Sequence, residues 1–266
     1  MRVLTIGGLI LGLGLVFGPA VEARRIVILY AAASPIVKAL GVYEEVVGVT
    51  RTDRVFPQAI KVGSHLRPNL ELIRALSPDL VIVGSKKAFP DSAAKRLKAE
   101  IFRYDPRTLE EVLEAIKALG KVLGREESAR DLVSRLKRKL AAVKPLPQSV
   151  TVIYEVSSWP LKVAGARSIV SDIIRAAGGR NLVPQDKKHV LLSPEMVLAL
   201  QPDFYLYQVG PMNKNPVPPK KRPYFKGLKS LVIRVAEEEF ARPGINSFSA
   251  AVKLNRIFFE NLNRQP

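Results

Sequence analysis

Short apolar runs alternate with amphipathic segments along most of the chain. The runs are rich in Val, Ile and Leu, as in 80–83, and fully apolar runs are typical of strands buried in a parallel sheet. The segments between them repeat apolar residues with a helical period. Expected strands are 25–30, 46–49, 80–83, 101–102, 150–154, 163 and 204–207; expected helices are 36–40, 69–76, 92–98, 108–119, 124–143, 168–177, 196–200 and 245–261. This order predicts an α/β fold with mainly parallel sheets.

One expected helix, 124–143, separates two such α/β runs. Its apolar positions follow one face and charged residues occupy the others. We therefore predict two similar lobes joined by one long rigid helix, with a ligand cleft between the lobes. The expected boundaries are a signal peptide at 1–23, a first lobe at 24–123, the linking helix at 124–144 and a second lobe at 145–266.

The two halves share an internal repeat. Aligning 71–80 on 195–204 matches Glu, Ala, Leu, Pro and Asp at an offset of 124 residues, from 71 to 195. Common turn chemistry after a helix accounts for the Pro and the Asp but not for the other three matches. The repeat supports two related lobes.

The N-terminus carries an apolar stretch at 3–21, preceded by Arg2 and followed by a polar boundary. This is typical of a secretory signal peptide, with a cut expected after Ala23; an uncleaved anchor is the alternative, because the stretch is about long enough to span a bilayer. We expect a periplasmic protein. Because the chain has no cysteine, we do not expect a lipoprotein.

Charge and missing motifs narrow the function. The 42 Lys and Arg residues outnumber 24 Asp and Glu, and this net charge of +18 suits an anionic partner, although heat adaptation also favours such a composition. Export argues against nucleic acid as the partner. The chain has no nucleophile elbow, no phosphate-binding loop and no His-Glu-x-x-His motif, so we expect a binding protein and not an enzyme.

Several stretches in order resemble the class III periplasmic solute-binding proteins of ABC importers. They are Val62-Gly63, 69–71, 78–82, 163–165, 172–174, 177–181, 193–195, 201–203 and Arg242-Pro243-Gly244. The resemblance implies a two-lobed monomer with no cofactor of its own, which captures an iron chelate (ferric siderophore or haem) and delivers it to an ABC permease. Cobalamin is the alternative ligand; outside the family, the alternatives are a secreted basic binding module and an unrecognised hydrolase. It also implies that Glu71 and Glu195, one on each lobe, contact the permease.

Loops at the carboxyl ends of the expected strands supply the candidate ligand residues, because ligands of α/β sheets bind there. Arginines can pair with ligand carboxylates, and the only tryptophan can stack on a flat ligand. A solvated surface role is the alternative for the arginines, and packing at the rim is the alternative for Trp159. The candidates are Ser34, Arg51, Arg54, His65, Arg67, Ser158, Trp159, His189 and Gln208.

The only two histidines, His65 and His189, are related by the same 124-residue offset. We therefore expect them to face the cleft from opposite lobes as metal ligands, the alternative being two unrelated loop histidines. In haem-binding members of the resembled family, the residue after Val-Gly is often an iron-ligating tyrosine; here Ser64 occupies that position and His65 follows. With a reference pKa near 6.5, such ligands would lose the metal below about pH 6.

Overall fold

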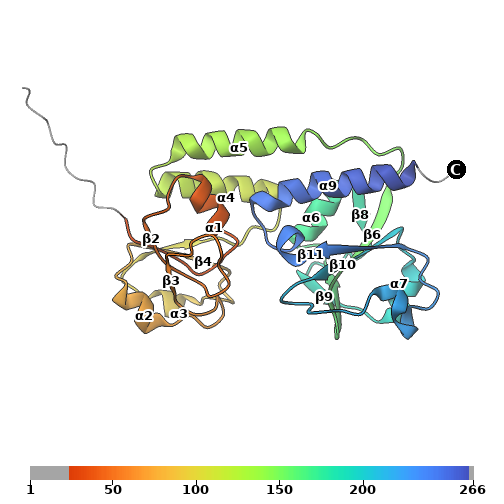
Figure 1. Cartoon of the computed structure of the whole chain (residues 1–266), viewed down its shortest axis with the longest axis horizontal. Coiled ribbons are helices and arrows are strands. Elements are labelled where there is room, and N and C mark those ends of the chain that lie inside the picture. The colour runs from red at the N-terminus through yellow and green to blue at the C-terminus, as the bar shows by residue number, and fades with distance from the viewer. Residues whose placement is uncertain (1–23, 264–266) are drawn as a thin grey trace, which may run out of the picture.

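The computed structural model describes residues 24–263, and the expected signal peptide lies outside them. The chain forms two α/β lobes side by side, with long helices running along one side of both (Figure 1). In the part of the chain described, no helix is long and apolar enough to cross a membrane.

The first lobe contains a five-stranded sheet in the order β3-β2-β1-β4-β5, and every neighbouring pair is parallel. Short helices connect most of these strands, as expected for parallel pairs, which need crossover connections, whereas a loop joins β2 to β3. The elements are β1 (Ile26–Ile28), α1 (Ser34–Ala39), β2 (Val46–Val49), β3 (Ile60–Lys61), α2 (Leu70–Ala75), β4 (Leu80–Val83), α3 (Asp91–Ala94) and β5 (Glu100–Arg103).

The second lobe contains a sheet in the order β11-β10-β6-β7-β9, and β8 also pairs with β6. Strands β10, β11 and β8 extend it in parallel, whereas β7 is antiparallel to both β6 and β9. Its elements are β6 (Val150–Ser158), β7 (Leu161–Ala164), α6 (Ile169–Ala176), β8 (Gly179–Asn181), β9 (His189–Leu191), α7 (Pro194–Leu200), β10 (Phe204–Val209), two short 3-10 turns at Pro219–Lys221 and Pro223–Phe225, β11 (Leu231–Ala236), α8 (Glu237–Phe240) and α9 (Ile245–Leu262).

The expected linking helix, 124–144, is present, and it runs antiparallel to the expected helix 108–119. Helix α4 (Leu109–Val122) begins at Thr108, whose side chain caps it, and α5 (Glu126–Leu140) returns along it. Helix α5 also packs on α9 of the second lobe. The expected lobe boundaries stay a prediction.

Each sheet is covered on both faces, which explains why its central strands are apolar throughout. One hydrophobic core runs without interruption through both lobes, beneath α4, α5, α6 and α9. Two smaller cores cover the opposite faces, one under α2 and α3 and one under α7 and the loop before β11. The shared core joins the two lobes into one packed body on the helix side.

Interlobe hydrogen bonds add to this core. The Tyr104 hydroxyl, at the end of β5, donates to the Pro243 carbonyl at 2.9 Å, and both residues are buried. The backbone NH of Leu109 donates to the Asp172 carboxylate at 2.7 Å. These bonds link the start of α4 to the second lobe.

Candidate functional site

A groove of about 490 Å³ lies between the lobes, at the carboxyl ends of strands from both sheets. The first lobe supplies the loops after β1 and β2, and the second lobe supplies residues following β10 and β11. Its lining includes Ala31, Pro35, Arg51, Thr52, Asp53, Arg54, Val55, Pro211, Glu238, Arg242 and Asn246. The structure thus places the two predicted arginines, Arg51 and Arg54, between the lobes.

A buried carboxylate shapes the loop that carries these arginines. Asp53 accepts hydrogen bonds from the backbone NH groups of Val55 (2.8 Å) and Phe56 (3.2 Å), and from the Ser34 hydroxyl. The turn leaves Arg51 and Arg54 exposed, and neither forms an ion pair with any residue in 24–263. Ser34 itself is fully buried, so it supports this loop from within instead of facing a ligand.

A third arginine faces the groove from the second lobe. Arg242 is half-buried, and the Asn246 side-chain amide fixes its segment by donating to the carbonyls of Arg242 (2.7 Å), Glu239 (2.8 Å) and Glu238 (3.1 Å). Arg242 belongs to the motif before the last helix, but we did not expect it in the site. The groove therefore has cationic groups on both walls.

His65 lies at the tip of a tight turn after β3. Backbone hydrogen bonds between Ser64 and Arg67 close this turn, at 3.3 and 3.2 Å. Gly63 is required there, because its φ of +103° is a left-handed conformation and a Cβ would lie 2.7 Å from the Arg67 carbonyl oxygen. The turn presents both His65 and Arg67 at the surface, and the His65 ring lies 6.1 Å from the Tyr30 ring.

His189 begins β9 and pairs with Ala164 of β7. The preceding loop lies directly against Gly165, whose backbone NH donates to the Lys188 carbonyl at 3.1 Å. A Cβ at this glycine would lie 2.3 Å from the Lys187 carbonyl oxygen, so only glycine permits this approach. The half-buried His189 and Lys188 are held in place by that contact.

Lys188 acts electrostatically on both histidines. Partial burial, followed by the charges of Lys188 and Arg242, lowers the pKa of His65. Burial, followed by Lys188 and Lys162, lowers the pKa of His189 to about 4. Both rings are therefore neutral at pH 7, the form that binds metals. Since Lys188 belongs to the second lobe, its effect on His65 acts across the cleft.

The same region contains a tyrosine and further charges. Burial and then Asp105 raise the pKa of Tyr30 to about 12, while Arg242 and Arg107 oppose the shift. Burial and Arg107 lower the pKa of Lys188, and Asp105 opposes this. The charges around the histidines are mainly positive, which disfavours a bare metal cation and favours a metal held within an anionic chelate. Residues 24–263 contain no cluster of three or more His, Asp and Glu side chains that could hold a metal ion by itself.

Neither His65, Arg67 and His189 nor the remaining candidates, Ser158, Trp159 and Gln208, line the groove itself. Trp159 is 87% exposed at the β6–β7 hairpin, and neighbouring Ser158 donates through its NH and hydroxyl to the Asn213 side chain, both at 3.0 Å. Gln208 is fully buried; its amide donates to the Val156 carbonyl at 2.9 Å and accepts from the Tyr154 hydroxyl at 3.0 Å. Gln208 is therefore a core residue and does not reach a ligand.

Glu71 and Glu195 are exposed in the first turns of α2 and α7. These helices begin at equivalent caps, because the Asn69 side chain accepts from the Leu72 NH and the Ser193 hydroxyl from the Met196 NH. Their exposure is the arrangement expected for contact residues; the permease contact itself stays a prediction.

Sequence reasoning missed Tyr30, Asp105, Arg107, Lys188 and Arg242. Tyr30 and Asp105 directly follow parallel strands, so the rule of carboxyl strand ends could have identified them. Lys188 precedes a strand that we did not expect, and no pattern in the sequence placed it near His65.

The comparisons assign the family. The periplasmic binding protein family matches residues 26–217, so the chain belongs to it, and the fold is that of the class III binding proteins of ABC importers. A curated relative, the uncharacterized ABC transporter substrate-binding lipoprotein YvrC of Bacillus subtilis, is 28% identical over 199 residues. The match covers 68% of this chain and 62% of YvrC, less than two thirds of its length.

Solved structures share the fold. The periplasmic heme-binding protein HutB of Vibrio cholerae has a TM-score of 0.78 at 21% identity, covering 90% of this chain and all of HutB. The periplasmic vitamin B12 binding protein BtuF of Vibrio cholerae has a TM-score of 0.72 at 22% identity, covering 91% of this chain and 99% of BtuF. The chain is thus a periplasmic binding protein with the fold of ABC-importer binding proteins, and a haem-binding and a vitamin B12-binding protein are among its structural neighbours.

Proposed function

We propose that this protein binds a negatively charged iron chelate, haem or a ferric siderophore, in the groove between its lobes and delivers it to an ABC permease. The observation that carries the proposal is the pair of neutral histidines, with Lys188 acting on both, Arg242 on His65 and Lys162 on His189. Neutral imidazoles can complete the coordination of iron, and the surrounding cations stabilise the anionic part of the chelate. The role is binding without catalysis.

Arg51, Arg54 and Arg242 fit the same role. They approach the groove from both lobes, so a ligand with carboxylates or other anionic oxygens can contact both walls at once. Cobalamin, the alternative ligand, does not require so many cationic side chains around it. BtuF supports that alternative through the fold alone.

Absorbance titration with hemin tests the proposal. We expect wild-type protein to bind hemin with a shifted Soret band, and His65→Ala and His189→Ala each to change that spectrum and weaken binding. Leu66→Ala is the matched control, because Leu66 is exposed on the same turn as His65 and carries no ligand atom. If ferric siderophores and hemin both fail to bind while cyanocobalamin binds, the iron assignment is wrong.

A further inference from the structure

An apolar hollow of about 290 Å³ opens on the second lobe. Large side chains on its edge face solvent: Trp159 is 87% exposed, Leu191 63% and Tyr224 39%. Exposed apolar surface of this kind marks interaction sites. We call the feature the rim hollow; its lining residues are Ser158, Trp159, Pro160, Leu161, Leu191, Leu192, Pro194 and Tyr224.

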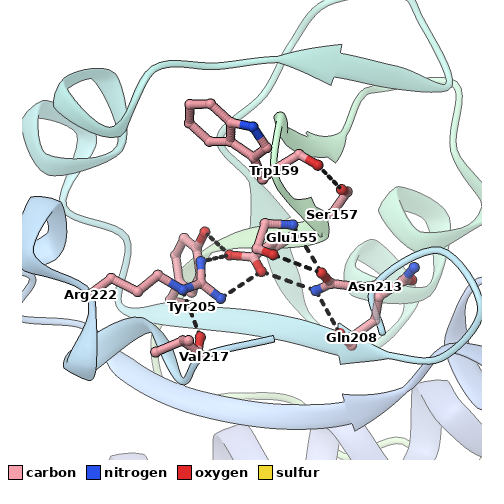
Figure 2. A network of polar contacts seen from close by, with 9 residues as sticks. Glu155, Ser157, Trp159, Tyr205, Gln208, Asn213, Val217 and Arg222 are labelled. Carbon is pink, nitrogen blue, oxygen red and sulfur yellow. Dashed lines mark hydrogen bonds and ion pairs between the residues drawn. The ribbon is translucent and has the colours of Figure 1, made fainter. Parts of the chain in front are cut away.

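A buried polar network holds two walls of the rim hollow in place (Figure 2). Arg222 and Glu155 form a buried bidentate ion pair, at 2.5 and 2.9 Å, which fixes the segment that carries Tyr224. Asn213 donates to Glu155 at 3.1 Å and accepts from Ser158, next to Trp159. The Tyr205 hydroxyl donates to Glu155 at 2.6 Å. In Figure 2 the Trp159 indole points away from this network.

The rim hollow is smaller than most ligand sites and shares no lining residue with the interlobe groove, although its Leu191 lies two residues after His189 on β9. Sites for small molecules usually measure about 300–1,000 Å³, so this hollow suits a single bulky side chain better than a metal chelate. A side chain from another protein therefore fits the volume of the rim hollow.

The hollow continues directly into the exposed start of α7. Pro194 lines it, and the next two residues are Glu195 and Met196, the latter 51% exposed. Glu195 forms no ion pair within the described residues, and the Ser193 hydroxyl lowers the pKa of its carboxyl, which keeps it ionised. An apolar hollow thus lies beside an available negative charge.

The equivalent region of the first lobe differs. Glu71 is already paired with Arg74 at 3.0 Å and with Arg96 at 3.6 Å. Position 67, related to Leu191 by the repeat offset, is an arginine. The two exposed carboxylates are therefore not equivalent, because one is neutralised by its own lobe.

We propose that the rim hollow receives an apolar side chain from a loop of the ABC permease, while Glu195 pairs with a basic residue next to it. The inference rests on the proposed function, and it makes the second lobe the main anchor of an asymmetric docking surface. A second copy of this chain is disfavoured as the occupant, because each copy carries a net charge of +18.

The test measures hemin-loaded protein binding to the permease of the source organism, reconstituted in lipid nanodiscs. We expect Leu191→Ser and Tyr224→Ser each to weaken permease binding about tenfold or more, with hemin affinity unchanged. Leu231→Ser is the matched control, since Leu231 is 41% exposed on β11 and lies outside the hollow. Glu195→Gln should weaken binding more than Glu71→Gln, because Glu71 is paired within its own lobe.

The inference is wrong if Leu191→Ser binds the permease as tightly as Leu231→Ser does. It is also wrong if the hemin affinity of Leu191→Ser falls in parallel with its permease affinity. Concentration-dependent self-association of the wild type that Leu191→Ser removes would likewise overturn it. Circular dichroism and melting temperature check the fold of each variant, and Leu191→Ser, on an exposed side chain, remains informative if Tyr224→Ser unfolds. Wild-type protein that binds hemin but no permease would refute the delivery step of the proposed function instead.

Discussion

At the residue scale, the surroundings of each polar side chain decide its role more than its residue type does. Ser34 and Gln208 follow expected strands, as candidate ligand residues should, yet Gln208 lies within β10 and both side chains are fully buried and hydrogen-bonded within the fold. Arg51 and Arg54 lie on a loop held by Asp53 and stay exposed. The buried serine thus supports the groove, whereas the exposed arginines line it.

Asp53→Ala should destabilise the protein by about 1–3 kcal/mol, because it leaves two backbone NH groups and the Ser34 hydroxyl without their acceptor. It should also weaken hemin binding by displacing Arg51 and Arg54. Urea unfolding and hemin titration measure the two effects. The control is Asp186→Ala, since Asp186 is 78% exposed and forms only a 3.7 Å surface pair with Arg167. Equal effects of the two variants would contradict this prediction.

His189 should make the protein less stable in acid. Its folded pKa is about 4 and its ordinary value is 6.5, so between these values the unfolded chain binds a proton that the folded protein does not. Its contribution is complete above about pH 7 and is lost as the pH falls from 6.5 towards 4. In His189→Gln, the drop in unfolding free energy from pH 7 to pH 5 should be smaller by about 1 kcal/mol, allowing for partial exposure. Identical drops would refute this.

The same shifts revise the expected pH range of ligand release. Reference values place proton competition for the histidines near pH 6, but the pKa of each is lowered in the fold. We therefore expect hemin retention to persist below pH 6 in the wild type. Hemin transfer to apomyoglobin, measured from pH 7 to pH 4.5, checks this. Half-release close to pH 6.5 would contradict it.

At the scale of elements, the repeat extends further than the sequence alignment indicated. The starts of β1 and β6, of α2 and α7, and of β4 and β10 are all related by the 124-residue offset. In both copies, the aspartate after the helix binds the backbone of the neighbouring strand. Asp79 accepts from the Arg25 NH and Asp203 from the Thr151 NH, both at 2.7 Å. The Pro-Asp pair thus attaches a helix end to the sheet.

Asp203→Ala should cost more stability than Asp79→Ala. Asp203 also accepts from the Thr151 hydroxyl at 2.6 Å, whereas Asp79 accepts only from the backbone. Both are exposed, so we expect losses of about 1 and about 0.5 kcal/mol. Thermal unfolding of both variants, and of Asp203→Ala combined with Thr151→Val, measures the difference. A larger loss in Asp79→Ala would contradict the assignment.

At the scale of the whole molecule, the connection between the lobes favours small motions. The core is continuous through α4, α5 and α9, and the buried Tyr104 hydroxyl binds the second lobe. Opening would have to separate packed apolar surface and not merely bend a loop. The ligand groove therefore has walls in nearly fixed positions.

Small-angle scattering with and without hemin should show no measurable fall in the radius of gyration. In Tyr104→Phe, which loses the bond to the Pro243 carbonyl, we expect a stability loss of about 1 kcal/mol and the same scattering, because the shared core remains. A clear fall in the wild-type radius on binding would show hinged closure and contradict the rigid connection.

The sequence by itself determined the α/β class, the repeat and most central elements, because a strand buried on both faces must be apolar throughout and an amphipathic helix must repeat with the helical period. Strand 80–83 and helix 108–119 follow these rules and occur as β4 and α4. The edge strands β8, β9 and β11 were not expected. The first two have only three residues each and a weak pattern, whereas β11, with the sequence LVIRVA, is apolar enough for its sequence to have predicted it.

Only the tertiary structure decided which side chains form the candidate site. Lys188 lies close enough to act on His65 only because the two lobes pack together, although 123 residues separate the two along the chain, from 65 to 188. Likewise, the Glu155–Arg222 pair joins a strand to a loop far along the chain. The burial of a side chain and the charges near it depend on segments that are distant in sequence. The local spacing of apolar and polar residues, in contrast, indicates only the secondary structure of its own segment.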